Sequence, residues 1–200
     1  MTIQRLIPLG LAALAACTGA RRAAESALAA ADSAIAALPA EAQNISPEQV
    51  KTLNEAVKVG RQAIEAGDYE AASTSLYGLA EQAQALVDSL PSRRAALTAE
   101  MDTLAIAMPR NLEGIKVELD KIARTRRLPA GLDQQQLQEA KDTHATAGPL
   151  WADITQAFAS GKLADAMDRA HDLKARVSRV MLSLGMVADE RAWSNVTLPR

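Results

Sequence analysis

Apolar residues recur every three or four positions along most of the chain, which is the spacing of helices with one buried face. This pattern predicts helices over residues 21–38, 46–66, 68–90, 92–126, 133–160 and 163–187. Because the spacing alternates between three and four with few faults, it favours neighbouring helices packed as in a coiled coil. The predicted fold class is therefore all-α, an antiparallel helical bundle of about six helices.

Capping residues mark the ends of several predicted helices. Ser46, Pro47 and Gln49 form a capping-box pattern at the start of the second helix. Gly67 suits a left-handed C-cap after that helix, and Asp133 is the expected N-cap of the fifth. Gly60 lies on the apolar stripe of the second helix, where it indicates a close helix crossing.

Prolines are expected to interrupt the helices. Pro91 should end the third helix, because proline cannot donate a backbone hydrogen bond. Pro109 and Gly148-Pro149 lie within predicted helices, and each is expected to kink or split its helix. The tail after the sixth helix should be irregular, with Trp193 folding back onto the end of the bundle.

The two halves of the chain share a loose internal repeat. Residues 57–90 and 151–184 have seven identities in 34 positions. Leu-Pro-Ala precedes the second helix at residues 38–40 and the fifth at residues 128–130. Each half thus reads helix, loop, helix, glycine turn, helix, which predicts two related three-helix halves. The predicted halves are residues 21–91 and 92–192.

The glycine turn resembles part of a known repeat. Residues Ala63–Ala72 are similar to the bend between the two helices of a tetratricopeptide repeat, where Gly, a large apolar residue and Ala recur. The resemblance covers about ten residues, twice, and the 34-residue period of that family is absent. It therefore indicates a shared helical hairpin and no family membership.

Residues 1–17 have the parts of an export signal. Arg5 is their only charge, and residues 6–16 form an apolar run that is shorter than the about 20 residues needed to span a bilayer. The run ends in Leu14-Ala15-Ala16-Cys17, which resembles the lipobox of bacterial lipoproteins. The resemblance implies that Cys17 receives a diacylglyceryl thioether, that the chain is cut before it, and that the new amine is acylated, with palmitate as the expected fatty acid.

Two other interpretations of this segment stay open. An ordinary secretory signal could be cut at Ala13-Leu14-Ala15 and leave a soluble periplasmic protein, or the apolar helix could be retained uncleaved. The lipobox is favoured because Cys17 is the only cysteine and has no disulfide partner. The expected organisation is a signal peptide over residues 1–16, a lipidated cysteine with a short tether over 17–20, and a helical domain over 21–200.

The residues around Cys17 bear on its location. Thr18 replaces the aspartate that resembles an inner-membrane retention signal in enteric lipoproteins, so we expect an outer-membrane anchor that faces the periplasm. Arg21 and Arg22 would then lie near anionic head groups, unless they only make the helix end soluble. Arg200 is not the C-terminal lysine of the small murein lipoprotein, so no covalent link to peptidoglycan is expected.

Composition supports closely packed helices and argues against nucleic acid as a partner. The formal net charge is −2, and removing residues 1–16 takes away Arg5 alone, so 22 basic side chains become 21 against 24 acidic ones. Nucleic-acid-binding domains are usually strongly basic. Aromatic residues make up only 2% of the chain, whereas alanine, the best helix former, is abundant.

Candidate catalytic chemistry is sparse. The two histidines lie near apolar stripes: His144 is either a ligand or a hydrogen-bonded histidine at a helix break, and His171 lies at a stripe edge. Met101 and Met108 either line an adaptable groove or belong to the core. The basic loop over residues 124–131 either touches a phosphate-bearing envelope surface or is only solvated.

No catalytic, metal-binding or cofactor-binding residues are expected, because no Cys-x-x-Cys-His, Glu-x-x-His, Gly-x-Ser-x-Gly or phosphate-binding glycine pattern occurs. The sequence favours a non-enzymatic, membrane-anchored periplasmic lipoprotein that acts as a helical binding or scaffolding module for an envelope protein. The alternative is a bundle that binds an apolar or lipid-like small ligand between its halves.

Overall fold

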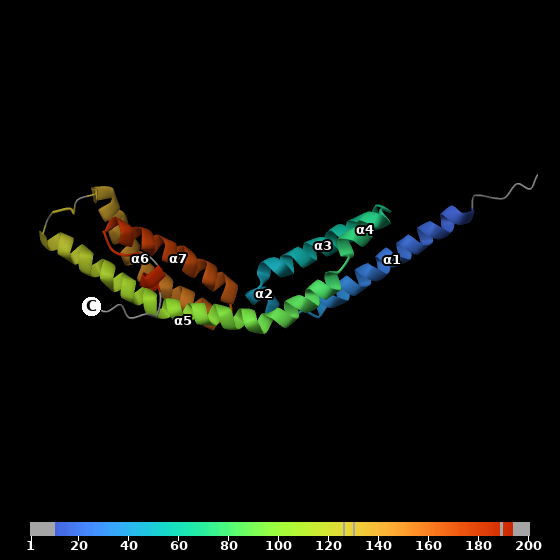
Figure 1. Ribbon diagram of the computed structural model, residues 1–200, viewed down its shortest axis with the longest axis horizontal. Helices are drawn as coiled ribbons and strands as arrows, with labels where there is room; N and C mark the ends of the chain where they lie inside the picture. Colours follow the sequence, from blue (N-terminus) through green and yellow to red (C-terminus); the bar gives the residue numbers. More distant parts are fainter. Residues whose placement is uncertain (1–10, 126, 130, 189, 194–200) are drawn as a thin grey trace, which may run out of the picture. The chain divides into compact units, whose positions relative to one another are not determined.

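The computed structural model describes residues 11–125, 127–129, 131–188 and 190–193. Within these ranges every regular element is a helix and none is a strand, which confirms the predicted all-α fold (Figure 1). The elements are α1 (Leu11–Ala36), α2 (Ala42–Ile45), α3 (Pro47–Glu65), α4 (Tyr69–Leu76), α5 (Leu79–Thr125), α6 (Gln134–Ala159), α7 (Leu163–Ser183) and the 3₁₀ helix η1 (Glu190–Trp193).

The chain divides into two compact units, unit 1 (Met1–Leu90) and unit 2 (Pro91–Arg200). Unit 1 contains α1 to α4 and the first turns of α5, and within it α1, α3 and α4 pack on one another. Unit 2 contains the rest of α5 with α6, α7 and η1. There α6 and α7 pack side by side (Figure 1) and share a core with α5. Each unit is therefore a small helical bundle with its own core.

Helix α5 is continuous through Pro91, so the prediction that this residue ends a helix is wrong. Pro109 also lies inside α5, and Pro149 lies inside α6, so neither splits its helix. A proline in a helix interior costs about 3 kcal/mol. Burial of neighbouring side chains offsets this cost, since Leu90 and Met108, which precede two of the prolines, are 2% and 0% exposed.

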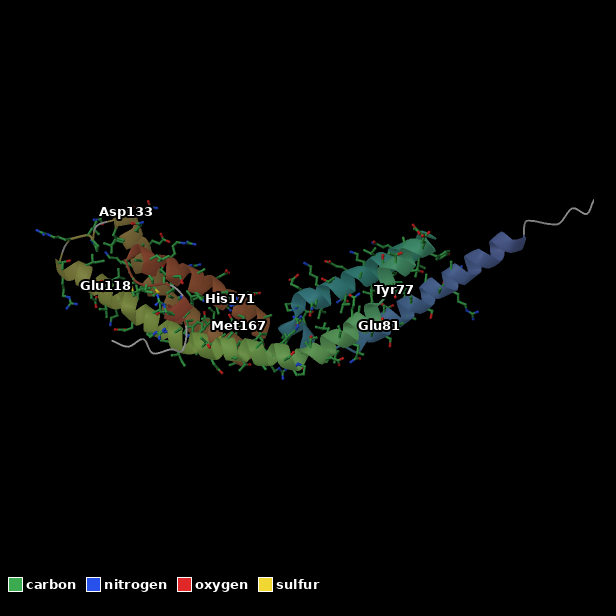
Figure 2. All side chains as sticks on the ribbon, in the orientation of Figure 1. Tyr77, Glu81, Glu118, Asp133, Met167 and His171 are labelled. Carbon is green, nitrogen blue, oxygen red and sulfur yellow. The ribbon has the colours of Figure 1, made fainter. Side chains whose placement is uncertain are left out.

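The break in this part of the chain lies instead between α4 and α5. Tyr77 has an extended backbone, with φ of −61° and ψ of 128°, and Gly78 has a φ of 69°. Glycine enters this left-handed region without the steric penalty of a Cβ. Gly78 therefore provides the interruption that the sequence analysis assigned to Pro91, and it leaves the Tyr77 side chain exposed (Figure 2).

Two other helix ends differ from the predictions. Helix α1 begins at Leu11 rather than at residue 21, because the intervening segment is rich in Ala and Leu, which favour helix, and contains no proline. Helix α7 ends at Ser183 rather than at residue 187, since Gly185, with a φ of 73°, forms its C-terminal turn.

The capping predictions have different outcomes. Asp133 is confirmed as an N-cap: it accepts a hydrogen bond from the backbone N–H of Gln136 at 2.7 Å, and the Gln136 side chain accepts one from the backbone N–H of Asp133 at 2.9 Å. Ser46 is the N-cap of α3, but its side chain makes no capping hydrogen bond. The capping box predicted there is therefore wrong, and the helix starts at Pro47, which has no N–H to satisfy.

Unit 1 brings its helices together through small residues. The residues of α1 that are fully buried are Ala24 and Ala31, at 0% and 1% exposure, in the part of the helix whose side chains are described. A Cβ added to Gly60 of α3 would lie 2.5 Å from Cγ of Leu76 in α4. The predicted close crossing at Gly60 is therefore confirmed, and Leu76 fills the space of the missing side chain.

Unit 2 has a core of larger side chains. Met101 and Met108 belong to it, at 6% and 0% exposure, which decides between the two roles that the sequence left open for them. The core also contains leucines, isoleucines and Trp151 from α5, α6 and α7. Burying such a side chain contributes about 1.5–3 kcal/mol, so this core is the larger source of hydrophobic stabilisation.

The two units bury equivalent positions. Ten residues of α3, α4 and the start of α5 are buried: Val50, Leu53, Val57, Gly60, Ala72, Leu76, Leu79, Ala83, Leu86 and Leu90. Nine of the ten residues that follow them by 94 positions are also buried, and the exception, His144, is half-buried. Gly67 and Gly161 have φ values of 78° and 91°. After each glycine, the next N–H donates to the carbonyl five residues back, at 2.9 Å and 3.1 Å. The glycine turn is thus the same in both units.

The C-terminal segment closes onto unit 2 at η1. Trp193 is 4% exposed, and its Nε1 donates to Oγ of Ser178 at 2.9 Å. The ammonium of Lys174 lies 5.6 Å from the centroid of the Trp193 ring. The side-chain amide of Asn111 in α5 donates to the carbonyl of Ala192 at 2.9 Å. These contacts confirm the predicted return of Trp193, while the tail after it lies outside the described residues.

Candidate functional site

The predicted lipidation motif lies in the first helix. Helix α1 includes the backbone of residues 14–17 and continues without a break to Ala36. Residues 18–20, which were expected to form a short tether, are therefore helical in the uncleaved chain. At a rise of 1.5 Å per residue, Arg21 lies about 6 Å along the helix axis from Cys17. A lipid on Cys17 would thus be joined directly to a helix.

Arg21, about one helical turn after Cys17, forms an ion pair with Glu25. Its Nε donates to Oε1 of Glu25 at 2.8 Å. This hydrogen bond, and then the charge of Glu25, raise the pKa of the Arg21 guanidinium above its ordinary value. Arg21 is therefore charged at every physiological pH, and Glu25 balances part of that charge. The contact of Arg21 and Arg22 with anionic head groups stays a prediction.

The two histidines differ in their exposure. His144 is half-buried, because Thr143, at 5% exposure, takes the core position that the stripe assigned to its neighbour. His171 is exposed on α7, as Figure 2 shows, and its Nε2 lies 2.6 Å from Oε1 of Glu100 on α5. Across the described ranges, no group of three or more His, Cys, Asp or Glu residues is arranged to hold a metal ion.

The basic loop connects α5 to α6. Arg124, which was assigned to this loop, lies in the last turn of α5, where its Nε donates to the backbone carbonyl of Asp120 at 3.2 Å. Arg126 and Ala130 lie outside the described residues. Arg127 is described, and its side chain reaches a cleft at the end of unit 2.

This cleft opens between the last turns of α5 and the first turns of α6. It has a volume of about 210 Å³, and its lining residues are Leu119, Ile122, Ala123, Arg127, Leu128, Gln134, Leu137 and Lys141. Figure 2 labels Glu118 and Asp133, which precede Leu119 and Gln134 in the two walls. Ile122 and Leu137 are 8% and 9% exposed, so the floor of the cleft is the edge of the core. We call this feature the α5–α6 cleft.

Positive charge dominates the α5–α6 cleft. Arg127 and Lys141 line it, and none of its other described lining residues is a carboxylate. No hydrogen bond or ion pair joins the guanidinium of Arg127 or the ammonium of Lys141 to another residue of the described ranges. The cleft therefore combines an apolar floor with two cations that are free to meet an anion.

The basic loop was recognisable in the sequence, whereas the cleft was not. Leu119, Ile122 and Leu137 all lie on predicted stripes, so they were assigned to the core without a sign that the stripes end in an open surface. One signal was present in the sequence: the two stripes converge on a loop in which Leu128 directly follows a basic segment.

Comparison with protein-family models, curated proteins and solved structures finds no significant match to this chain. Within the ranges that the structure describes, none of the helices is both long and apolar enough to cross a membrane.

Proposed function

We propose that this protein is a non-enzymatic lipoprotein of the cell envelope, anchored in the outer membrane through acyl chains on Cys17 and acting as a periplasmic helical binding or scaffolding module. The observation that carries the proposal is the position of the single cysteine at the end of an apolar run, in the order Leu-Ala-Ala-Cys. Acyl chains contribute about 0.8 kcal/mol per buried CH₂, so two or more of them give a stable anchor.

The fold is compatible with a module that binds or scaffolds. Each unit is a helical bundle whose core consists of apolar side chains, and no cluster suited to metal chemistry occurs in the described ranges. Two similar units in one chain offer a partner two repeated helical surfaces. The partner we propose is a second envelope protein, and chemical cross-linking in the envelope followed by purification of the acylated protein would identify it.

The lipid anchor can be tested in cells that are fed an alkyne-bearing fatty acid. The wild-type protein should incorporate the label, and a Cys17→Ala variant should lose it, because no other thiol is present. Thr18→Ala serves as the matched control and should be labelled like the wild type. Absence of label in the wild type, or equal labelling of Cys17→Ala, would contradict the proposal.

The outer-membrane location has a separate test. A Thr18→Asp variant should move the acylated protein to the inner-membrane fraction of a density gradient, whereas Thr18→Ala should stay in the outer-membrane fraction. Equal distribution of both variants would remove the argument for outer-membrane sorting and leave the argument for lipidation intact.

The alternative function is a bundle that binds an apolar or lipid-like ligand between its halves. The α5–α6 cleft favours an apolar ligand, although at a different place from the one predicted. That cleft lies within unit 2 and is lined by apolar side chains at the edge of the core.

A further inference from the structure

We propose that the α5–α6 cleft binds a free single-chain amphiphile with an anionic head group, such as a medium-chain fatty acid. The acyl chain would lie over the apolar floor of the cleft, and the carboxylate would meet Arg127 and Lys141. This site is independent of the acyl chains on Cys17, so it stands or falls separately from the lipid anchor.

The walls of the cleft suit the apolar part of the proposed ligand. Leu119 and Ile122 come from α5, Leu137 comes from α6, and Leu128 comes from the loop between them. Leu128 is 37% exposed, and an apolar ligand in the cleft would cover it. Three segments of the chain thus present leucine or isoleucine to one cavity.

The charged side chains of the lining suit the anionic head group of the proposed ligand. Among the lining residues that the structure describes, Arg127 and Lys141 are the only ionised side chains. Arginine offers a planar fork that matches a carboxylate, and lysine adds a point charge on a flexible stem. A cationic amphiphile would be repelled by both, and a neutral one would gain nothing from either.

The size of the cleft selects a single chain. Its volume of about 210 Å³ is smaller than the roughly 300–1,000 Å³ of pockets that enclose drug-sized ligands. A phospholipid with two acyl chains would leave most of its tails in water. One medium-length chain fits the cleft, and its head can remain at the rim because the cleft is open to solvent.

Photolabelling of the full 200-residue chain tests this inference. The probe is decanoate that carries a diazirine in its chain, and the labelled peptides are mapped by mass spectrometry. We expect saturable labelling within residues 119–141 that unlabelled decanoate competes away. Affinity in a series of fatty acids should rise about fourfold for each added CH₂ until the chain outgrows the cleft.

Variants separate the two parts of the site. Arg127→Gln and Lys141→Gln should each weaken binding about two- to fivefold, and their combination should weaken it more. Leu128→Gln should remove one apolar side chain from the wall of the cleft and reduce the gain in affinity for each added CH₂. The matched control is Lys162→Gln with Arg176→Gln, two exposed cations of unit 2 outside the cleft, which should bind like the wild type.

Several outcomes would overturn the inference. Labelling that does not saturate, or that maps outside residues 119–141, would refute the location. Equal competition by decanol or by decyltrimethylammonium, or unchanged binding in the Arg127→Gln, Lys141→Gln double variant, would refute the anionic head group. Competition by phosphatidylglycerol vesicles but not by decanoate would assign the surface to membrane lipid and refute a free ligand.

Discussion

Replacing Gly60 by alanine should destabilise unit 1, whereas the same replacement at Gly148 should stabilise unit 2. In a helix interior, alanine is favoured over glycine by about 1 kcal/mol. At Gly148 of α6 no atom lies within 4 Å of the added Cβ, apart from its chain neighbours and the backbone of its own helix. Pro149 follows it, and a Cβ before proline is disfavoured in a helix, so the gain should be positive but smaller than about 1 kcal/mol. At Gly60 the Cβ would lie 2.5 Å from Cγ of Leu76. Overpacking costs about 1–3 kcal/mol, which leaves a net destabilisation of up to about 2 kcal/mol.

Gly114 gives an intermediate case in the same series. A Cβ there would lie 2.9 Å from Cε of Met186, the tip of a flexible side chain that can move away. Gly114→Ala should therefore change stability by less than about 1 kcal/mol in either direction. The stability of each of the three variants should therefore depend on which neighbouring atom its new methyl group contacts.

A double variant shows whether Leu76 is the cause of the loss at Gly60. Leu76→Ala alone should cost about 2–5 kcal/mol, because it removes a buried side chain. In the Leu76→Ala background the new methyl group at residue 60 has space, so Gly60→Ala should recover the gain of about 1 kcal/mol. The two substitutions should therefore be strongly non-additive.

Urea unfolding of the full chain, followed by far-UV circular dichroism, measures these differences. Thermal midpoints should shift by about 2–4 °C per kcal/mol for a chain of this size. The reasoning is refuted if Gly60→Ala stabilises the protein as much as Gly148→Ala does. It is also refuted if the loss at Gly60 persists unchanged in the Leu76→Ala background.

Three further predictions concern single contacts. Trp193→Phe removes the hydrogen bond to Ser178 and should cost about 1 kcal/mol of stability. Trp193→Ala empties a buried site and should cost about 3–5 kcal/mol. Equal costs of the two variants in thermal unfolding would contradict the packing role of η1. Asp133→Ala removes the capping box of α6 and should cost about 1 kcal/mol, and no change in the urea midpoint would count against it. Asp32 accepts two hydrogen bonds from Nη2 of Arg61, both at 2.9 Å, yet the pair is exposed, so Asp32→Ala should cost less than about 1 kcal/mol. That small cost should fall further in high salt, and a salt-independent loss would be unexpected.

The helical stripes predict most of the core because burial follows the periodicity of the sequence. Gly67 and Gly161 were recognisable as turns, since a glycine just after a periodic segment favours a left-handed cap. The repeat was also visible, although alanine-rich sequence makes identity a weak measure. Burial at positions 94 residues apart supports it more strongly than identity does.

The breaks between helices were harder to predict, because proline and glycine act in competition with packing. Pro91 gives the stronger local signal, yet its helix continues, with Leu90 buried immediately before it. Gly78 interrupts no apolar spacing, because Leu76 and Leu79 remain three positions apart across the break. The apolar spacing therefore continues without a fault across a turn that only the backbone geometry reveals.

The α5–α6 cleft could not be derived from one segment, because its walls come from two helices and the loop that joins them. Periodicity assigns Ile122 and Leu137 to a buried face but does not say where that face ends. Thr143 and His144 show the same limit at single-residue scale, since either residue satisfies the three-four spacing. Three-dimensional packing decides which of the two is buried.

The most direct test of the proposed function is the intact mass of the protein purified from the membranes of its host. We predict a chain that begins at Cys17 and carries the added mass of a diacylglyceryl group and an amide-linked fatty acid. A chain that begins at Ala16 with a free thiol, or one that retains residues 1–16 without lipid, would contradict the account.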